Sequence, residues 1–91
     1  MLAIQITASD DLEITYYYQC GSDEDNYVIP RGDEIYILRS YITDIQVRNV
    51  GSDKFVININ LTNNSCYRLY TNTHVYKQLS NTLFNSNNVG E

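Results

Sequence analysis

Apolar and polar residues alternate along most of this 91-residue chain, and this period of two is the feature that most limits its fold. Successive side chains of an extended strand point to opposite faces, so alternation predicts strands with one buried and one solvated face. The clearest case is residues 55–62. Its predicted core positions are Phe55, Ile57, Ile59 and Leu61. The abundance of Ile, Val, Thr and Tyr beside only two alanines also favours strands over helices.

Seven strands are expected before the period changes. Their ranges are 2–7, 12–19, 27–29, 34–40, 42–50, 55–62 and 66–71. The connections between them are at most seven residues long, which predicts antiparallel neighbours in a meander over residues 2–71. On the second strand, we expect the core face to be formed by Leu12, Ile14, Tyr16 and Tyr18.

The last part of the chain has helical periodicity. Asn72 or Thr73 is a suitable N-cap, and an apolar stripe follows at i, i+4 spacing. The stripe consists of Val75, Tyr76, Leu79 and Leu83, with Phe84 on its flank. The pattern predicts a helix over 73–85 and a polar, frayed tail over 86–91.

The chain is therefore expected to be a single α+β domain, residues 1–91, with seven short antiparallel strands in a bent sheet or partial barrel and one C-terminal amphipathic helix. This order is similar to that of the pleckstrin-homology-like superfold, in which a helix plugs one end of a bent seven-stranded sheet. The alternative is a two-layer sandwich of sheet and helix. Lipid-binding members of the pleckstrin-homology-like superfold hold phosphoinositides with basic residues around the first hairpin loop. Here that loop is the acidic segment 8–11, so the resemblance argues against a lipid ligand.

The charges are strongly segregated along the sequence. Residues 1–34 contain eight acids against the single base Arg31, whereas residues 35–91 contain three acids against five bases. The whole chain has a net charge of -5. Such asymmetry gives information about partners rather than about fold.

Nucleic-acid binding is not expected, because affinity for DNA or RNA comes mainly from Lys and Arg that neutralise phosphates. The six bases are scattered, and a patch of Arg39, Arg48 and Arg68 on one sheet face would be weak.

The residues that could support catalysis or metal binding are few. His74 is the only histidine, and nothing in the sequence places it beside Cys20 or Cys66 as a nucleophile–base pair. The spacing of these three residues does not match a zinc site. The acids of 23–26 lack the order of an EF-hand loop and are expected to stay solvated. We therefore expect no enzyme activity, no cofactor and no metal. Whether the two cysteines are free or bridged remains open.

An acidic, tyrosine-containing surface is the best candidate for a binding site. Tyrosine supplies contact area at low entropic cost, and carboxylates steer the encounter with a basic partner. The predicted partner-binding residues are Asp10, Asp11, Glu13, Tyr17, Asp23, Glu24, Asp25, Tyr27, Asp33 and Glu34. The alternative is that these acids only keep a small β protein soluble and protect its strand edges.

The leading hypothesis is a non-enzymatic protein-binding module, most concretely a small acidic inhibitor encoded by a phage or mobile element. It would dock on the basic nucleic-acid-binding surface of a host defence complex, as anti-CRISPR and anti-restriction DNA mimics do. Small size, acidity and a composition rich in residues with A/T-rich codons resemble that class. The alternative is a structural or adaptor subunit that binds a peptide by strand addition or through a sheet–helix groove.

The chain is expected in the cytoplasm, which would be that of the host cell for a phage protein. The N-terminus does not resemble a signal peptide, and no apolar run approaches the roughly 20 residues that span a bilayer. No membrane partner is expected. The oligomeric state stays open, and a homodimer through edge strands is one alternative.

Overall fold

The protein folds into seven strands followed by one helix, in the order that the sequence predicts. The computed structural model describes residues 3–22 and 24–84. The strands are β1 (Ala3–Thr7), β2 (Leu12–Tyr17), β3 (Asn26–Val28), β4 (Glu34–Leu38), β5 (Ile42–Gly51), β6 (Lys54–Leu61) and β7 (Cys66–Thr71). A single 3-10 turn, η1 (Arg39–Tyr41), joins β4 to β5, and the helix is α1 (Thr73–Phe84). The tail expected at residues 86–91 lies outside the described residues.

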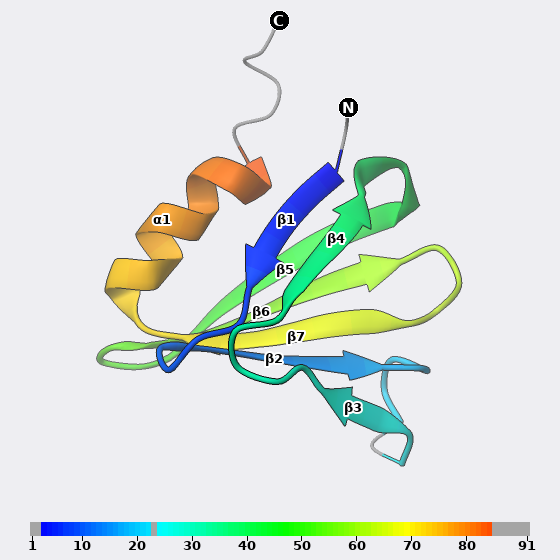
Figure 1. Cartoon of the computed structure of the whole chain (residues 1–91), viewed down its shortest axis with the longest axis horizontal. Helices are drawn as coiled ribbons and strands as arrows, with labels where there is room; N and C mark the ends of the chain where they lie inside the picture. The colour runs from blue at the N-terminus through cyan, green and yellow to red at the C-terminus, as the bar shows by residue number, and fades with distance from the viewer. Residues whose placement is uncertain (1–2, 23, 85–91) are drawn as a thin grey trace, which may run out of the picture.

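The strands form two antiparallel sheets and do not close into a barrel, which confirms the predicted α+β class. The larger sheet has the order β3-β2-β7-β6-β5, and the smaller one pairs β1 with β4. Both the β1–β4 pair and α1 lie over one face of the larger sheet (Figure 1). We call this the inner face and the opposite one the outer face. In the described part of the chain, no helix is long and apolar enough to cross a membrane.

The prediction of a continuous meander over residues 2–71 is wrong. β2 pairs with β3 on one side and with β7 on the other, so β1 has no free edge of β2 to pair with. The turn after β1 instead carries the chain between layers, and hydrogen bonds hold it to the loop before β4. Ala8 N donates to Asp33 O at 2.9 Å, and Gly32 N donates to Ala8 O at 2.8 Å.

The core lies between the two layers and consists mainly of isoleucine. β1 and β4 supply Ile4, Ile6, Ile35 and Ile37. The larger sheet and the helix supply Leu12, Ile14, Ile57, Ile59, Leu69 and Leu83. All ten side chains are at least nine-tenths buried, and burying one of this size stabilises the fold by about 1.5–3 kcal/mol. The period-two alternation thus identifies the inner face correctly.

One predicted core position, Tyr18, differs, and Phe84, on the flank of the helical stripe, is also exposed. Tyr18 is 59% exposed, because β2 ends at Tyr17 and the chain then leaves the sheet. Its ring packs edge-on against Tyr16, with the centroids 5.0 Å apart. In the helical stripe Leu83 is buried, whereas its neighbour Phe84 is 47% exposed.

Both ends of α1 are held by residues that flank β5. At the N-terminus, Asn72 is the N-cap, since its Oδ1 accepts a hydrogen bond from Val75 N at 2.9 Å. The Asp53 carboxylate, in the β5–β6 turn, accepts another from Thr73 N at 2.9 Å. At the C-terminus, the Arg39 guanidinium donates to the carbonyls of Thr82 and Leu83. A carboxylate at the N-terminus and a guanidinium at the C-terminus both match the helix dipole.

Two leucine truncations test where the core lies. Leu69→Ala empties a fully buried site and should lower the free energy of unfolding by about 2–5 kcal/mol. Leu38→Ala makes the same chemical change at a position 44% exposed and should cost less than about 1 kcal/mol. Urea unfolding followed by circular dichroism measures both. Equal losses would contradict the assignment of the inner face.

Candidate functional site

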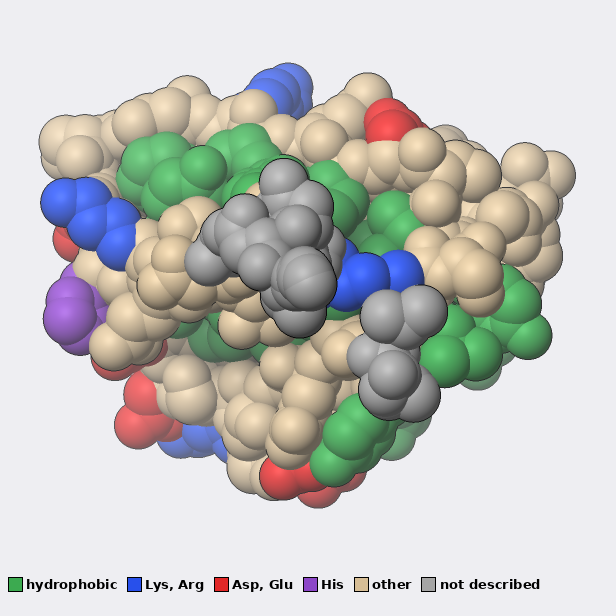
Figure 2. Space-filling model, turned by 90° about the horizontal axis from the view of Figure 1, so that it is seen from above, with side chains coloured by type: hydrophobic (Ala, Val, Ile, Leu, Met, Phe, Trp, Pro, Cys, Tyr) green, Lys and Arg blue, Asp and Glu red, His purple; other side chains and the backbone are tan. Residues whose placement is uncertain are grey.

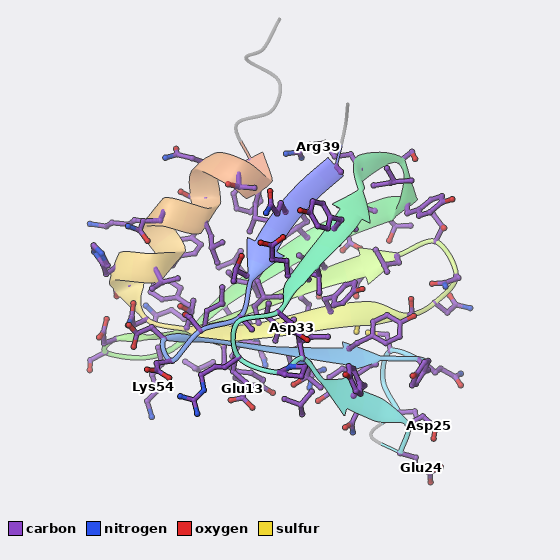
Figure 3. The ribbon with its side chains drawn as sticks, viewed as in Figure 1. Glu13, Glu24, Asp25, Asp33, Arg39 and Lys54 are labelled. Carbon is purple, nitrogen blue, oxygen red and sulfur yellow. The ribbon has the colours of Figure 1, made fainter. Side chains whose placement is uncertain are left out.

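The acidic residues that flank β2 lie at its two ends, as their positions before and after that strand predict. Asp10 and Asp11 precede β2, whereas Asp25 lies beyond its other end, where Asp25 O accepts a hydrogen bond from Tyr18 N at 3.2 Å. Five residue steps along β2 span about 17 Å. Glu13 and the pair Glu24 and Asp25 accordingly lie toward opposite ends of the sheet (Figure 3). The segregation of acids in the sequence therefore becomes two separate acidic regions. Asp23 lies outside the described residues.

One acidic region forms at the turn between β1 and β2. Thr71 Oγ1 donates to Asp11 O at 2.7 Å and fixes the turn against the end of β7. Asp10 forms an ion pair with Arg31, which is the only ion pair within residues 3–22 and 24–84. Both of its side chains are more than two-thirds exposed, so we assign the pair little stabilisation. The turn leaves its carboxylates directed to solvent.

A groove of about 420 Å³ opens beside this turn. Four carboxylates line it, contributed by Asp10, Asp11, Glu13 and Asp53. Among the described residues that line the groove, Lys54 is the only base. The remaining lining residues are Val50, Phe55, Val56, Tyr70, Thr71 and Asn72. We call the four carboxylates and this groove the acidic end.

Pairing within the larger sheet explains why these segments meet. Glu13 lies opposite Tyr70, Tyr70 lies opposite Val56, and all three side chains belong to the outer face. The β5–β6 turn lies at the same end of the sheet, and it brings Asp53 and Lys54 to the groove. From the α1 side, acidic side chains lie around the rim of the molecule (Figure 2).

Asp53 has a structural role as well as a place in the groove. The hydrogen bond from Thr73 N lowers the pKa of the Asp53 carboxyl below its ordinary value. Asp53 therefore remains ionised at the start of α1. Substitution of Asp53 would disturb the helix, so it is a poor probe of binding.

Tyr17 lies on the outer face of β2, where Arg68 packs against it. The Arg68 guanidinium lies over its ring, with Cζ 4.7 Å from the centroid. Arg68 Nη1 donates to Tyr17 Oη at 3.4 Å, and Arg68 Nε donates to Asn58 Oδ1 at 3.0 Å. Tyr17 is half-buried in this cluster on the outer face. This cation–π contact requires strand pairing, so alternation alone does not reveal it.

The other predicted site residues lie apart from the acidic end. Tyr27, in β3, is 51% exposed and pairs across the ladder with Tyr16. Asp33 is held in the loop before β4, as described above. Glu34, in β4, accepts a hydrogen bond from Tyr36 Oη at 2.9 Å, and this bond raises the pKa of Tyr36. These residues are exposed, but they do not line the groove.

The second acidic region accompanies a pair of cysteines. The loop after β2 is fixed by Cys20 N, which donates to Asn64 O at 2.7 Å, and by the Cys20 thiol, which lies 3.4 Å from Asn60 Oδ1. Cys66 lies opposite Asn60 in the ladder and is fully buried. Both thiols are free, and Cys20 is exposed. Burial, together with a hydrogen bond to the Cys20 side chain, raises the pKa of the Cys66 thiol to about 12.

The residues considered for catalysis do not converge. His74 is exposed in the first turn of α1, close to the last residue of β7. Cys66 is the first residue of β7. The length of β7 places them about 17 Å apart along the chain direction. No group of three or more His, Cys, Asp or Glu side chains in the described ranges is arranged to hold a metal ion.

The three arginines weighed as a nucleic-acid patch are also divided between faces. Arg48 and Arg68 belong to the outer face, opposite Val56 and Asn58 respectively. Arg39 instead holds the C-terminus of α1. They do not form one basic surface.

Sequence reasoning missed Asp53, Lys54 and Tyr70 as parts of the groove. The segment 51–53 was expected as a turn, but the alternation of β5, β6 and β7 does not say which turns share an end of the sheet. The order β2-β7-β6-β5 decides this. The sequence indicated part of this arrangement, because the short β5–β6 connection predicts that those two strands pair.

Comparison with protein-family models, with curated protein sequences and with solved structures gives no match to this chain. What is established of its class is therefore structural, namely an α+β protein with two antiparallel sheets and a C-terminal helix. Any function must be argued from the surface itself.

The two cysteines should differ strongly in reactivity. Cys20 is exposed and should react with iodoacetamide in the native protein, whereas Cys66, which is buried and has a raised thiol pKa, should react only after unfolding. Mass spectrometry of peptides from native and urea-treated protein measures this. Equal labelling of both cysteines in the native protein would contradict the burial of Cys66.

The Cys66 thiol should also make folding sensitive to alkali. Its pKa in the folded state, about 12, exceeds the ordinary value of 9.0, so the folded state binds the proton more tightly. Its contribution to stability is complete below pH 9 and is lost as pH rises toward 12. Unfolding free energies over this range should fall more steeply for the natural chain than for Cys66→Ala. Parallel curves would contradict the assignment.

Proposed function

We propose that this protein is a non-enzymatic binding module whose acidic end docks on a basic surface of a partner protein. One observation carries the proposal. Two turns and one strand contribute four carboxylates to a single groove, against Lys54 among the described lining residues and Arg31, which pairs with Asp10. Carboxylates from separate segments held at one end of a rigid sheet produce a localised negative potential, and such a potential steers association with a basic surface.

The groove also offers contact area that is not charged. Val50 is 51% exposed and Tyr70 is 39% exposed, and both line it beside the carboxylates. Binding energy at protein interfaces is concentrated in a few large side chains, of which tyrosine is among the commonest. In this proposal, the carboxylates set the encounter and orientation, and Tyr70 supplies buried contact.

The narrower proposal is that the partner surface normally binds nucleic acid. A small acidic protein encoded by a phage or mobile element would then inhibit a host defence complex by occupying the groove meant for DNA or RNA. The net charge of -5 and the small size support this form, as does the clustering of carboxylates. The protein would contact no nucleic acid itself and would work in the host cytoplasm.

The alternative function is an adaptor that binds a partner by strand addition. The observation in its favour is that β5 ends the larger sheet, so one side of this ten-residue strand is unpaired within the described part of the chain. In such a complex, affinity comes from backbone hydrogen bonds and not from carboxylates.

Two matched charge reversals test the role of the acidic end. Asp11→Lys/Glu13→Lys changes the groove, and Glu24→Lys/Asp25→Lys makes the same change in net charge at the other end of the sheet. All four side chains are exposed, so neither variant disturbs the core. The groove variant should weaken partner binding by about tenfold or more through a slower association rate, whereas the distal variant should change it much less.

The assay uses a partner recovered by affinity capture on the immobilised chain and identified among basic nucleic-acid-handling proteins. Association and dissociation rates are then measured by surface plasmon resonance at low and high salt. Added salt should slow association with the natural chain, and an oligonucleotide should compete if the partner groove binds nucleic acid. Equal losses in both variants, or no loss in either, would reject the proposed docking surface. Loss on insertion of proline into β5 alone would favour strand addition.

A further inference from the structure

The residue order along the unpaired edge of β5 is self-complementary. Within β5, the register with β6 is uninterrupted from Asp44 to Asn49, and it is irregular on both sides of that stretch. Asp44, Gln46 and Arg48 belong to the outer face, while Ile45 and Val47 belong to the inner face. Around Gln46 the stretch is symmetric in chemistry, with an aliphatic residue on either side and opposite charges two positions from the centre.

This symmetry becomes complementarity when two copies of β5 lie antiparallel about a two-fold axis at Gln46. Asp44 of each copy then lies opposite Arg48 of the other, and Ile45 lies opposite Val47. Paired residues are an even number of positions apart in the sequence. Residues whose N–H and C=O point out of the sheet therefore lie opposite residues whose N–H and C=O also point out, as an antiparallel ladder requires. Opposite charges and aliphatic pairs directly across strands both stabilise a sheet.

We propose that the protein forms a homodimer by antiparallel pairing of β5 with β5 of a second copy, so that the two five-stranded sheets join into one. The interface is isologous, as two-fold symmetry requires. Two Asp44–Arg48 pairs would lie on the outer face and two Ile45–Val47 pairs on the inner face. The inference does not rest on the proposed acidic docking, because no residue of the stretch 44–49 lines that groove.

The charged residues of β5 are suited to this pairing. Arg48 is exposed and forms no ion pair within the described ranges, although Asp44 already accepts a hydrogen bond from Asn60 Nδ2 at 3.0 Å. Ile45 and Val47 are only partly buried at the edge of the core. A second strand would therefore cover apolar surface and supply an opposite charge to Arg48.

The other edge of the larger sheet lacks these properties. β3 has three residues, Asn26–Val28, and none of them is charged. Proteins commonly protect a long free edge with lysine, proline or an irregular register. The stretch 44–49 has neither lysine nor proline, and its irregularities lie only at its ends. Its single base, Arg48, is matched by Asp44 in the dimer.

A charge-swap series tests the proposal on the full chain. Asp44→Arg alone would place arginine opposite arginine at two points of the dimer, and Arg48→Asp alone would place aspartate opposite aspartate. Each single variant should raise the dimer dissociation constant by about tenfold or more. The double variant Asp44→Arg/Arg48→Asp restores two opposite-charge pairs and should dimerise as the natural chain does. Sedimentation velocity over a dilution series measures all four proteins.

Mixing the two single variants distinguishes the loss of charge pairing from a failure to fold. In a mixed pair, the two arginines of Asp44→Arg lie opposite the two aspartates of Arg48→Asp, so heterodimers should form where each variant alone is monomeric. A variant that failed to fold could not regain dimerisation in this way, and circular dichroism checks folding independently. A natural chain that stays monomeric across the series, or mixed variants that do not associate, would overturn the proposal. Either result would favour pairing of the β5 edge with a strand from a different protein.

Discussion

The structure depends on covering the inner face of the five-stranded sheet. That face presents Ile14, Ile57, Ile59 and Leu69, all fully buried, and a chain of this length has no second large sheet to place on it. Two different elements share the task, since the β1–β4 pair covers part of the face and α1 covers the rest (Figure 1). Because hydrophobic burial is the main favourable term in folding, this requirement determines where every other element lies.

The acidic end follows from the same requirement. β1 belongs to the covering layer and β2 to the larger sheet. The β1–β2 turn therefore crosses the end of the larger sheet and lies beside the β5–β6 turn. Asp10 and Asp11 thereby meet Asp53, which lies more than forty positions later in the chain. Asp53 also accepts a hydrogen bond at the start of α1, so one carboxylate links the helix to the surface proposed for docking. The proposed interface is therefore tied to α1 by a hydrogen bond.

Local patterns predicted the elements closely and the surface poorly. Each strand was expected within about two residues of its observed bounds, because period-two alternation is enforced by burial of one face. The N-cap at Asn72 was also predictable, since capping needs only a side chain and the next turn of backbone. The position of Tyr17 beneath Arg68 was not predictable, because the two residues are 51 positions apart and meet only through the β2–β7 ladder. By contrast, the separation of the acids before β2 from Glu24 and Asp25 was predictable, because the two groups lie in loops at opposite ends of one strand.

The sequence by itself determined the α+β class, the bounds of the strands and helix, the isoleucine-rich inner face and the excess of negative charge in the first third of the chain. Each of these depends on residues that are neighbours in sequence. Only the tertiary structure decided that β1 pairs with β4, that β5 is left as a free edge, and that four carboxylates surround one groove. These features depend on which strands pair, and pairing is selected by how the whole inner face is covered rather than by any single segment.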